Sequence, residues 1–168
     1  EDSTATRIKS SRKSYHPKII DSGIKITVEQ TTAIRNCAQT STVVCEEMEP
    51  GTQYAVNDPY HGGTHLNDLT LVRPVHLHGI HIGWVANRAH HADVGGEAPG
   101  SMPAHATEVD QEGYRVAPMP AVRGGEWLES FTEPFLEATR TPAERLGDLS
   151  AQLGANEAGA MRIEQLAT

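Results

Sequence analysis

The sequence is short of aromatic residues, cysteines and long apolar runs, and each shortage narrows the kind of protein that it encodes. Aromatic residues fill 5% of the 168 positions and hydrophobic residues 38%, so a core is modest and built mainly from Val, Leu, Ile and Ala. Cys37 and Cys45 suit neither a disulfide framework nor a metal-binding motif. No signal peptide is recognisable, and no apolar run approaches the roughly 18 residues of a membrane helix. These absences predict a soluble, cytoplasmic protein without a membrane partner.

Basic side chains are also scarce, except near the start of the chain. The formal net charge is −8, yet residues 1–18 are basic, with Arg7, Lys9, Arg12, Lys13 and Lys18. The remainder is therefore strongly acidic, which excludes nucleic acid as a main partner because such binding needs a concentrated basic face. We expect residues 1–27 to be a variable basic segment and residues 28–168 to form the folded unit. The chain begins with Glu1 rather than Met, which is compatible with a fragment, a processed chain or a shortened one.

The clearest local pattern is a β-hairpin in the middle of the chain. Leu69–His76 and Ile80–Asn87 are rich in β-branched and apolar residues, and Leu77-His78-Gly79 between them has the length and composition of a hairpin connection. In an antiparallel hairpin the start of the first strand lies beside the end of the second. Residues just before Leu69 and just after Asn87 should therefore meet in space.

Helices and a loop region are predicted around this hairpin. Apolar or small residues at spacings of three and four predict a helix over residues 28–48, followed by a short strand at Gln53–Asn57. Gly and Pro dominate residues 94–125, which predicts a long, ordered loop region. Residues 127–139 are predicted to be helical in part, limited by Pro134.

The last predicted helix begins at a capping sequence, Thr141-Pro142-Ala143-Glu144, and runs for near 25 residues. Its expected apolar face comprises Leu146, Leu149, Leu153, Ala160, Ile163 and Leu166. The predicted fold class is therefore α+β, an antiparallel hairpin or sheet with flanking helices and the Gly/Pro-rich loop region.

Two histidines and a carboxylate occupy positions that the hairpin should bring together. His65 and Asp68 are three residues apart before the first strand, and His90 and His91, either of which could approach them, follow the second. Imidazole nitrogens and carboxylate oxygens suit zinc, manganese or iron, and three protein ligands leave positions open for water and substrate. The alternative is coincidence, since the chain has nine histidines. For His76, His78 and His81 a surface location is the stronger interpretation.

Three further residues near these positions are candidates for catalysis. Asp58, before Pro59, is either a turn residue or a catalytic carboxylate. Arg88 is placed to clamp a carboxylate or phosphate, or else to form a structural ion pair. His91 is a third candidate because it adjoins His90. No serine or cysteine lies in a recognisable nucleophile setting, so covalent catalysis has no support.

An ordered series of segments resembles the succession of motifs in the hydantoinase B family. The segments are Asn57–Asp68, Gly83–Gly96, Pro99–Pro103, Glu112-Gly113, Arg123–Gly125, Arg140–Arg145 and Gly147–Asn156. The resemblance covers roughly residues 46–166. It implies that residues 28–168 are a partial hydantoinase B-like domain, which belongs to a larger subunit fold.

The resemblance implies an enzyme. Members are B-type subunits of ATP-dependent hydrolases that open the rings of hydantoin, N-methylhydantoin or 5-oxoproline, or related subunits of acetone and acetophenone carboxylases. It also implies a hetero-oligomer, in which an A-type ATP-binding subunit uses ATP to phosphorylate the cyclic amide or ketone substrate. By similarity, His65, Asp68 and His90 match the family's ligands for a divalent metal. Without its partner subunit the chain is expected to be inactive.

The sequence departs from the family in two ways. Members carry an upstream aspartate, in a segment like Asp-Phe-Ser-Cys, that completes the metal shell, whereas residues 14–20 read Ser-Tyr-His-Pro-Lys-Ile-Ile. Family chains are also several times longer. These departures leave a third interpretation open, in which the chain is a non-catalytic remnant or an assembly module.

Overall fold

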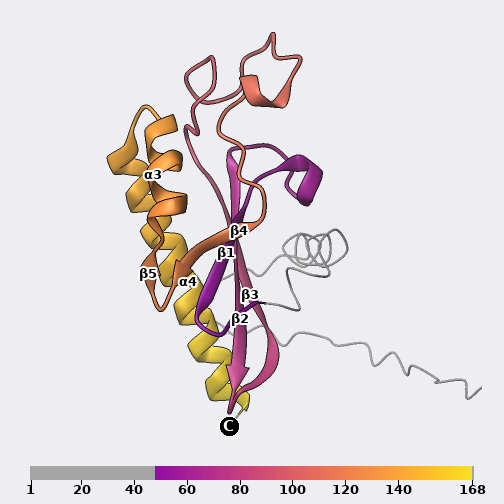
Figure 1. Cartoon of the computed structure of the whole chain (residues 1–168), viewed down its shortest axis with the longest axis vertical. Coiled ribbons are helices and arrows are strands. Elements are labelled where there is room, and N and C mark those ends of the chain that lie inside the picture. The colour runs from indigo at the N-terminus through magenta and orange to yellow at the C-terminus, as the bar shows by residue number, and fades with distance from the viewer. Residues whose placement is uncertain (1–47, 168) are drawn as a thin grey trace, which may run out of the picture.

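The computed structural model describes residues 48–167, which form an antiparallel five-stranded sheet with two helices against it (Figure 1). The strands lie in the order β3-β2-β1-β4-β5. They are β1 (Thr52–Val56), β2 (Asp68–Leu77), β3 (Ile80–His90), β4 (Met119–Arg123) and β5 (Glu126–Trp127). The helices are α3 (Glu129–Ala138) and α4 (Pro142–Ala167). The α+β class is therefore confirmed, with a larger sheet than one hairpin.

Some of the predictions concern parts of the chain outside the described residues. These are the basic segment 1–27, the helix over 28–48 apart from Met48, and both cysteines. Within residues 48–167, no helix is both long and apolar enough to cross a membrane.

The predicted hairpin is present as β2 and β3, and it is longer than its apolar pattern indicated. The connection is only His78-Gly79, because Leu77 already pairs with Ile80. His78 and Gly79 both have positive φ, 52° and 78°. Two-residue hairpin turns with positive φ at both positions are favoured because their twist matches the right-handed twist of the strands. At the other end β3 continues to His90, so the residues expected just after the hairpin belong to the strand itself.

Strand β4 lies inside the region predicted as loop. It pairs with β1, and Pro120 stands opposite Tyr54 beside a shift of register between Gln53 and Tyr54. β5 pairs only with Val122 and Arg123, at the far end of β4. Pro120 therefore lies at a bulge and beyond the reach of β5, where the missing N–H of a proline is tolerated. Residues 91–118 contain only one short helical turn, η2 (Val109–Gln111).

Helix α3 continues through Pro134, where the sequence predicted an interruption. Phe131 and Phe135, one helical turn apart, are fully buried with stacked rings 5.4 Å apart. Burying two phenylalanines contributes several kcal/mol, which offsets the backbone hydrogen bond that proline removes. Their rings belong to a core that includes Leu66, Leu69, Leu71, Val94, Val116, Ala121 and Leu149.

Helix α4 lies across β2 and β3 on the same side of the sheet as α3 (Figure 1). Its buried residues are Arg145, Leu149, Gln152, Asn156 and Ala160, so only Leu149 and Ala160 of the predicted apolar face are buried. Leu146 and Leu166 are exposed instead. Gln152 and Asn156 occupy the buried face because their amides donate to Leu69 O, at 2.9 Å, and Leu71 O, at 3.2 Å. A polar contact with the sheet thus replaces part of an apolar one.

The three glycines of α4 test this packing. A Cβ on Gly159 would lie 2.8 Å from Val85 Cγ1, whereas nothing lies within 4 Å of a Cβ on Gly147 or Gly154. We expect Gly147→Ala and Gly154→Ala each to raise the free energy of unfolding by up to about 1 kcal/mol, through helix propensity. Gly159→Ala should lower it by about 1–2 kcal/mol, because overpacking outweighs propensity there. Chemical denaturation measures all three, and an equal stabilisation by Gly159→Ala would contradict the packing.

Candidate metal centre

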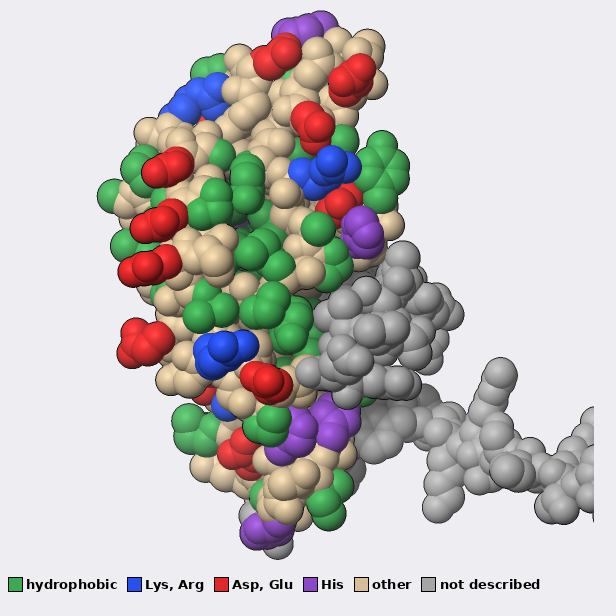
Figure 2. Space-filling model, viewed as in Figure 1, with side chains coloured by type: hydrophobic (Ala, Val, Ile, Leu, Met, Phe, Trp, Pro, Cys, Tyr) green, Lys and Arg blue, Asp and Glu red, His purple; other side chains and the backbone are tan. Residues whose placement is uncertain are grey.

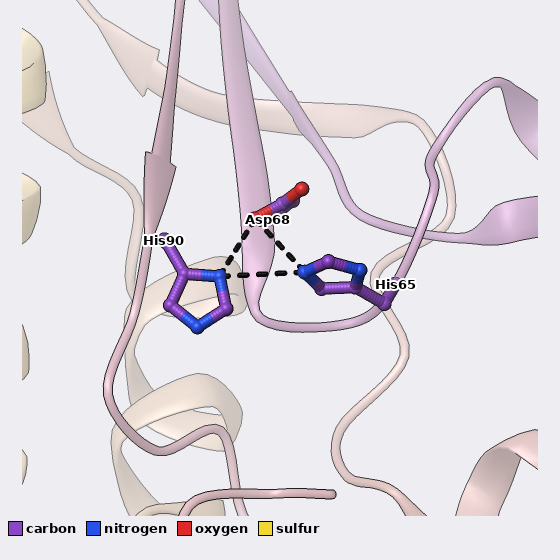
Figure 3. A group of neighbouring side chains, drawn as sticks. All are labelled: His65, Asp68 and His90. Atoms are coloured by element: carbon purple, nitrogen blue, oxygen red, sulfur yellow. Dashed lines mark hydrogen bonds and ion pairs between the residues drawn. The ribbon is translucent and has the colours of Figure 1, made fainter.

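The hairpin register brings His65, Asp68 and His90 together. Asp68, the first residue of β2, is the cross-strand partner of His90, the last residue of β3, and His65 precedes β2 in the adjoining loop. Both imidazoles converge on the carboxylate (Figure 3). Asp68 Oδ1 lies 2.9 Å from His90 Nδ1 and 3.2 Å from His65 Nε2, and the two nitrogens are 3.3 Å apart. This juxtaposition is the one that the hairpin topology predicted.

The triangle has the dimensions of a metal-ligand set. Two ligand atoms at about 2.0–2.1 Å from a tetrahedral zinc ion are about 3.3 Å apart, close to the three observed separations. The side chains of His65 and His90 are 43% and 53% exposed, and that of Asp68 18%. The donor set therefore fits a divalent ion such as zinc, manganese or iron, with one side open to water and substrate.

Local contacts keep Asp68 ionised. Burial alone would raise the pKa of Asp68, but hydrogen bonds with His90 and Thr64 and the nearby imidazoles together bring it below its usual value of 3.8. The Thr64 hydroxyl donates to Asp68 Oδ2 at 2.9 Å, which leaves Oδ1 toward the two histidines. A carboxylate in this state is the anionic ligand that a divalent cation needs.

Two buried asparagines hold the loop that carries His65. Asn57 Nδ2 donates to Leu66 O at 2.8 Å and to Tyr114 O at 3.0 Å, and its Oδ1 accepts from Val116 N at 2.6 Å. Asn67 Nδ2 donates to His91 O at 2.8 Å. Sequence reasoning missed both roles. Their only signal was a position inside Asn57–Asp68, the first segment that resembles the family.

The structure separates Asp58 and His91 from the cluster of three. Asp58 caps the short helix η1 (Pro59–His61), because its carboxylate accepts from Tyr60 N at 2.9 Å and contacts His61 Nδ1 at 2.8 Å. His91 is fully buried on the side of α4, with Nε2 3.0 Å from Gln152 Oε1. Burial lowers the pKa of His91, against the opposing effect of Gln152. Catalytic roles for Asp58 and His91 stay predictions that this geometry does not favour.

Arg88 shares the face of the cluster. Arg88 is the cross-strand partner of Thr70, and this pair is the next one on the same face of the hairpin after Asp68 and His90. Its Nε donates to Thr70 Oγ1 at 3.0 Å. Among residues 48–167 it forms no ion pair with a carboxylate. The structural ion pair considered from the sequence is therefore not present in the described part, and an anion-binding role stays a prediction.

Comparisons with known proteins decide the family. A family model described as hydantoinase B/oxoprolinase matches residues 20–168. This chain belongs to the hydantoinase B/oxoprolinase family. It is 37% identical over 110 residues to a 5-oxoprolinase of Dictyostelium discoideum, covering 66% of this chain and 9% of that protein. It is 31% identical over 121 residues to the caprolactamase subunit beta of Pseudomonas jessenii, covering 72% and 21%.

Solved structures agree with this family assignment. The ATP-dependent caprolactamase of Pseudomonas jessenii superposes with a TM-score of 0.74 and 28% identity over 80% of this chain and 23% of that one. Nucleotide-free acetone carboxylase superposes with a TM-score of 0.76 over 83% and 19%, and at 17% identity it shows a shared fold. The hydantoinase B-family chain thus spans less than a quarter of the length of each of these relatives.

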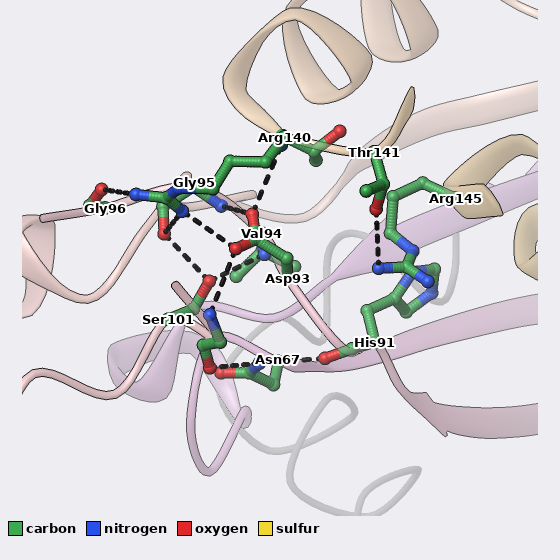
Figure 4. A network of polar contacts seen from close by, with 12 residues as sticks. Asn67, His91, Asp93, Val94, Gly95, Gly96, Ser101, Arg140, Thr141 and Arg145 are labelled. Atoms are coloured by element: carbon green, nitrogen blue, oxygen red, sulfur yellow. Dashed lines mark hydrogen bonds and ion pairs between the residues drawn. The ribbon is translucent and has the colours of Figure 1, made fainter. Parts of the chain in front are cut away.

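The second family segment is tied to the connection between α3 and α4 by a polar network (Figure 4). Asp93 accepts from Gly95 N at 2.9 Å, from Gly100 N at 3.1 Å and from Arg140 Nη1 at 2.7 Å. Burial would raise the pKa of Asp93, but these donors together lower it. The aspartate of this segment therefore has a structural role in the hydantoinase B-family chain, fixing the loop that follows His90.

The remaining histidines of the hairpin lie at its opposite end. His78 and His81 are exposed, and His76 is partly so. Figure 2 shows histidine side chains gathered at the lower end of the molecule, where the hairpin turns. His76 is the cross-strand partner of His81, with ring centroids 5.2 Å apart. The surface location predicted for this group is confirmed for His78 and His81.

Proposed function

We propose that this chain supplies the metal site of the B-type subunit of an ATP-dependent hydrolase that opens a cyclic amide ring, such as those of 5-oxoproline and hydantoin. The observation that carries the proposal is the triangle formed by Asp68 Oδ1, His65 Nε2 and His90 Nδ1. Its side lengths suit one divalent ion, and its histidines are half exposed. Relatives at 37% and 31% identity are named as a 5-oxoprolinase and a caprolactamase subunit.

Each residue of the triangle has a distinct task in this proposal. A divalent ion bound there would activate water and polarise the amide carbonyl. Asp68 provides negative charge, and the Thr64 hydroxyl fixes which of its oxygens faces the ion. His65 and His90 provide nitrogen ligands from a pinned loop and from a strand end, so their separation is set by the fold. Asp58 and His91 act as positioning residues for the η1 turn and the contact with α4.

The proposal includes a second subunit. Neither Gly62-Gly63 nor Gly95-Gly96 belongs to a complete phosphate-binding motif, and the resemblance to the family implies that a partner subunit uses the ATP. One relative is itself named as a subunit, which supports a multi-subunit enzyme. An A-type ATP-binding subunit in a hetero-oligomer is the partner that we propose.

The test uses the complete natural polypeptide together with its partner subunit. With ATP and a divalent metal, we expect 5-oxoproline or hydantoin to be converted to the ring-opened acid with matching release of ADP, measured by chromatography. Consumption of bicarbonate and a ketone, with both cyclic amides left intact, would show that the reaction is carboxylation and not hydrolysis. Carboxylation is the alternative suggested by the fold shared with acetone carboxylase. If the polypeptide bound its partner subunit but the complex turned over neither substrate, the result would support the assembly-module interpretation.

A further inference from the structure

Arg88 and the candidate metal ligands form a row on one face of the hairpin. Side chains at alternate positions of a strand point to the same face, so Arg88 and His90 share a face on β3, as Thr70 and Asp68 do on β2. Asn87, the residue before Arg88, points to the opposite face, toward α4, and donates to Gln152 O at 2.8 Å. The Cα atoms of Arg88 and His90 are about 7 Å apart in an extended strand. The row thus makes Arg88 the next residue on the same face of β3 from His90, a ligand of the triangle.

Arg88 differs from most other arginines of the described chain in its partners. Five arginines pair with carboxylates, namely Arg73, Arg115, Arg123, Arg140 and Arg145. Partly buried Arg88 is instead held by a neutral hydroxyl, through Nε alone. Among residues 48–167 its two terminal nitrogens have no partner. A guanidinium group oriented in this way presents two parallel N–H donors to a planar oxyanion.

We propose that Arg88 binds a carboxylate carried by the ring of the substrate and so makes the site select cyclic amides that bear one. This inference rests on the proposed function, because it places the amide carbonyl at the metal triangle. In 5-oxoproline the carboxylate carbon is four bonds from the carbonyl oxygen, which bridges part of the distance to the neighbouring residue pair. An oxyanion attached directly to the carbonyl oxygen, such as a phosphoryl group, would lie at the triangle and not beside Arg88.

Binding of two ring compounds tests the inference. The probes are 5-oxoproline and 2-pyrrolidinone, the same five-membered lactam without the carboxylate, titrated calorimetrically into the complete natural polypeptide loaded with zinc or manganese. We expect the wild type to bind 5-oxoproline about tenfold to a hundredfold more tightly, the range for a charge-assisted, bidentate contact. Arg88→Gln should remove this preference without changing the affinity for 2-pyrrolidinone, and Arg88→Lys should keep part of it.

Arg162 provides the matched control. It is an exposed arginine of α4 whose recorded contact is the neutral side chain of Gln165, at 3.4 Å, and Arg162→Gln should leave the preference unchanged. If Arg88→Gln weakened both lactams equally, or neither, the inference would be wrong. Inorganic phosphate is also tested as a competitor of lactam binding. If Arg88→Gln weakened the competition by phosphate but not the binding of 5-oxoproline, Arg88 would bind a phosphoryl group and the inference would again be wrong.

Metal analysis of the same samples separates this inference from the proposed function. A wild-type protein that holds metal but shows no preference for 5-oxoproline contradicts the role of Arg88 alone. If the protein holds no metal, yet the wild type prefers 5-oxoproline and Arg88→Gln does not, the result supports the role of Arg88 and contradicts the metal site. Thermal unfolding of Arg88→Gln and Arg88→Lys shows whether each variant is folded. If Arg88→Gln is unfolded, Arg88→Lys, which keeps the positive charge, provides the test instead.

Discussion

Replacing Asp68 by asparagine is expected to lower the affinity for zinc or manganese by about a hundredfold or more, since even loss of a residue behind the ligands costs ten- to a hundredfold. The substitution removes the one anionic ligand of the triangle while keeping its size. The Thr64 hydroxyl still finds an oxygen at this position, so the fold should be retained. Metal affinity is measured by competition with a chromophoric chelator, and ring opening by the assembled enzyme should fall in parallel.

His105 offers a matched control for this prediction. Its Nε2 lies 2.9 Å from Glu97 Oε2, the same distance as between His90 and Asp68, but the pair is exposed and forms no group of three ligands with any other residue of 48–167. Glu97→Gln should therefore leave metal affinity and activity unchanged. Equal metal binding by Asp68→Asn and the wild type would show that the triangle is not the metal site.

Replacing Asn57 by alanine should have the second largest effect, on both stability and metal affinity. The substitution leaves Leu66 O, Tyr114 O and Val116 N without their side-chain partner. Leaving a buried polar group unpaired costs about 1–3 kcal/mol, so the free energy of unfolding should fall by about 3 kcal/mol or more. The loop that carries His65 also loses its anchor, and metal affinity should fall about tenfold or more, as for other residues that orient ligands.

Asn156 separates the two effects. It is as buried as Asn57 and likewise makes three hydrogen bonds, but it lies on α4 and its partners Gln53, Leu71 and Asn87 are in the strands beneath that helix. Asn156→Ala should lower stability by a similar amount and leave metal affinity unchanged under conditions where the protein is folded. If both variants lost metal affinity equally, the effect of Asn57 would be one of global stability and its positioning role would be wrong.

The hairpin and the site that it forms were predictable because both follow from local patterns. The alternation in β2 and β3, with a short connection, determines which residues face each other across the strands. That register is enough to place Asp68 beside His90. The final helix was likewise predictable from the capping sequence at Thr141, whose carbonyl accepts from Glu144 N.

Features that depend on distant partners were not predictable from local patterns. Gln152 and Asn156 look like exposed residues of α4 until their acceptors on β2 are known, more than 80 positions away. Strand β4 was hidden by Pro120, which is tolerated because it lies beside the bulge in β1 and beyond the reach of β5. His91 was grouped with His90 because β3 was predicted to end at Asn87. Once the strand continues to His90, alternation places the two histidines on different sides.

Anomalous X-ray diffraction from crystals of the complete polypeptide, prepared without chelator and supplied with zinc or manganese, tests the central claim most directly. The account predicts one strong peak at about 2.0–2.2 Å from His65 Nε2, His90 Nδ1 and a carboxylate oxygen of Asp68. A peak at the other end of the hairpin, between His76 and His81, with none at the triangle, would contradict it.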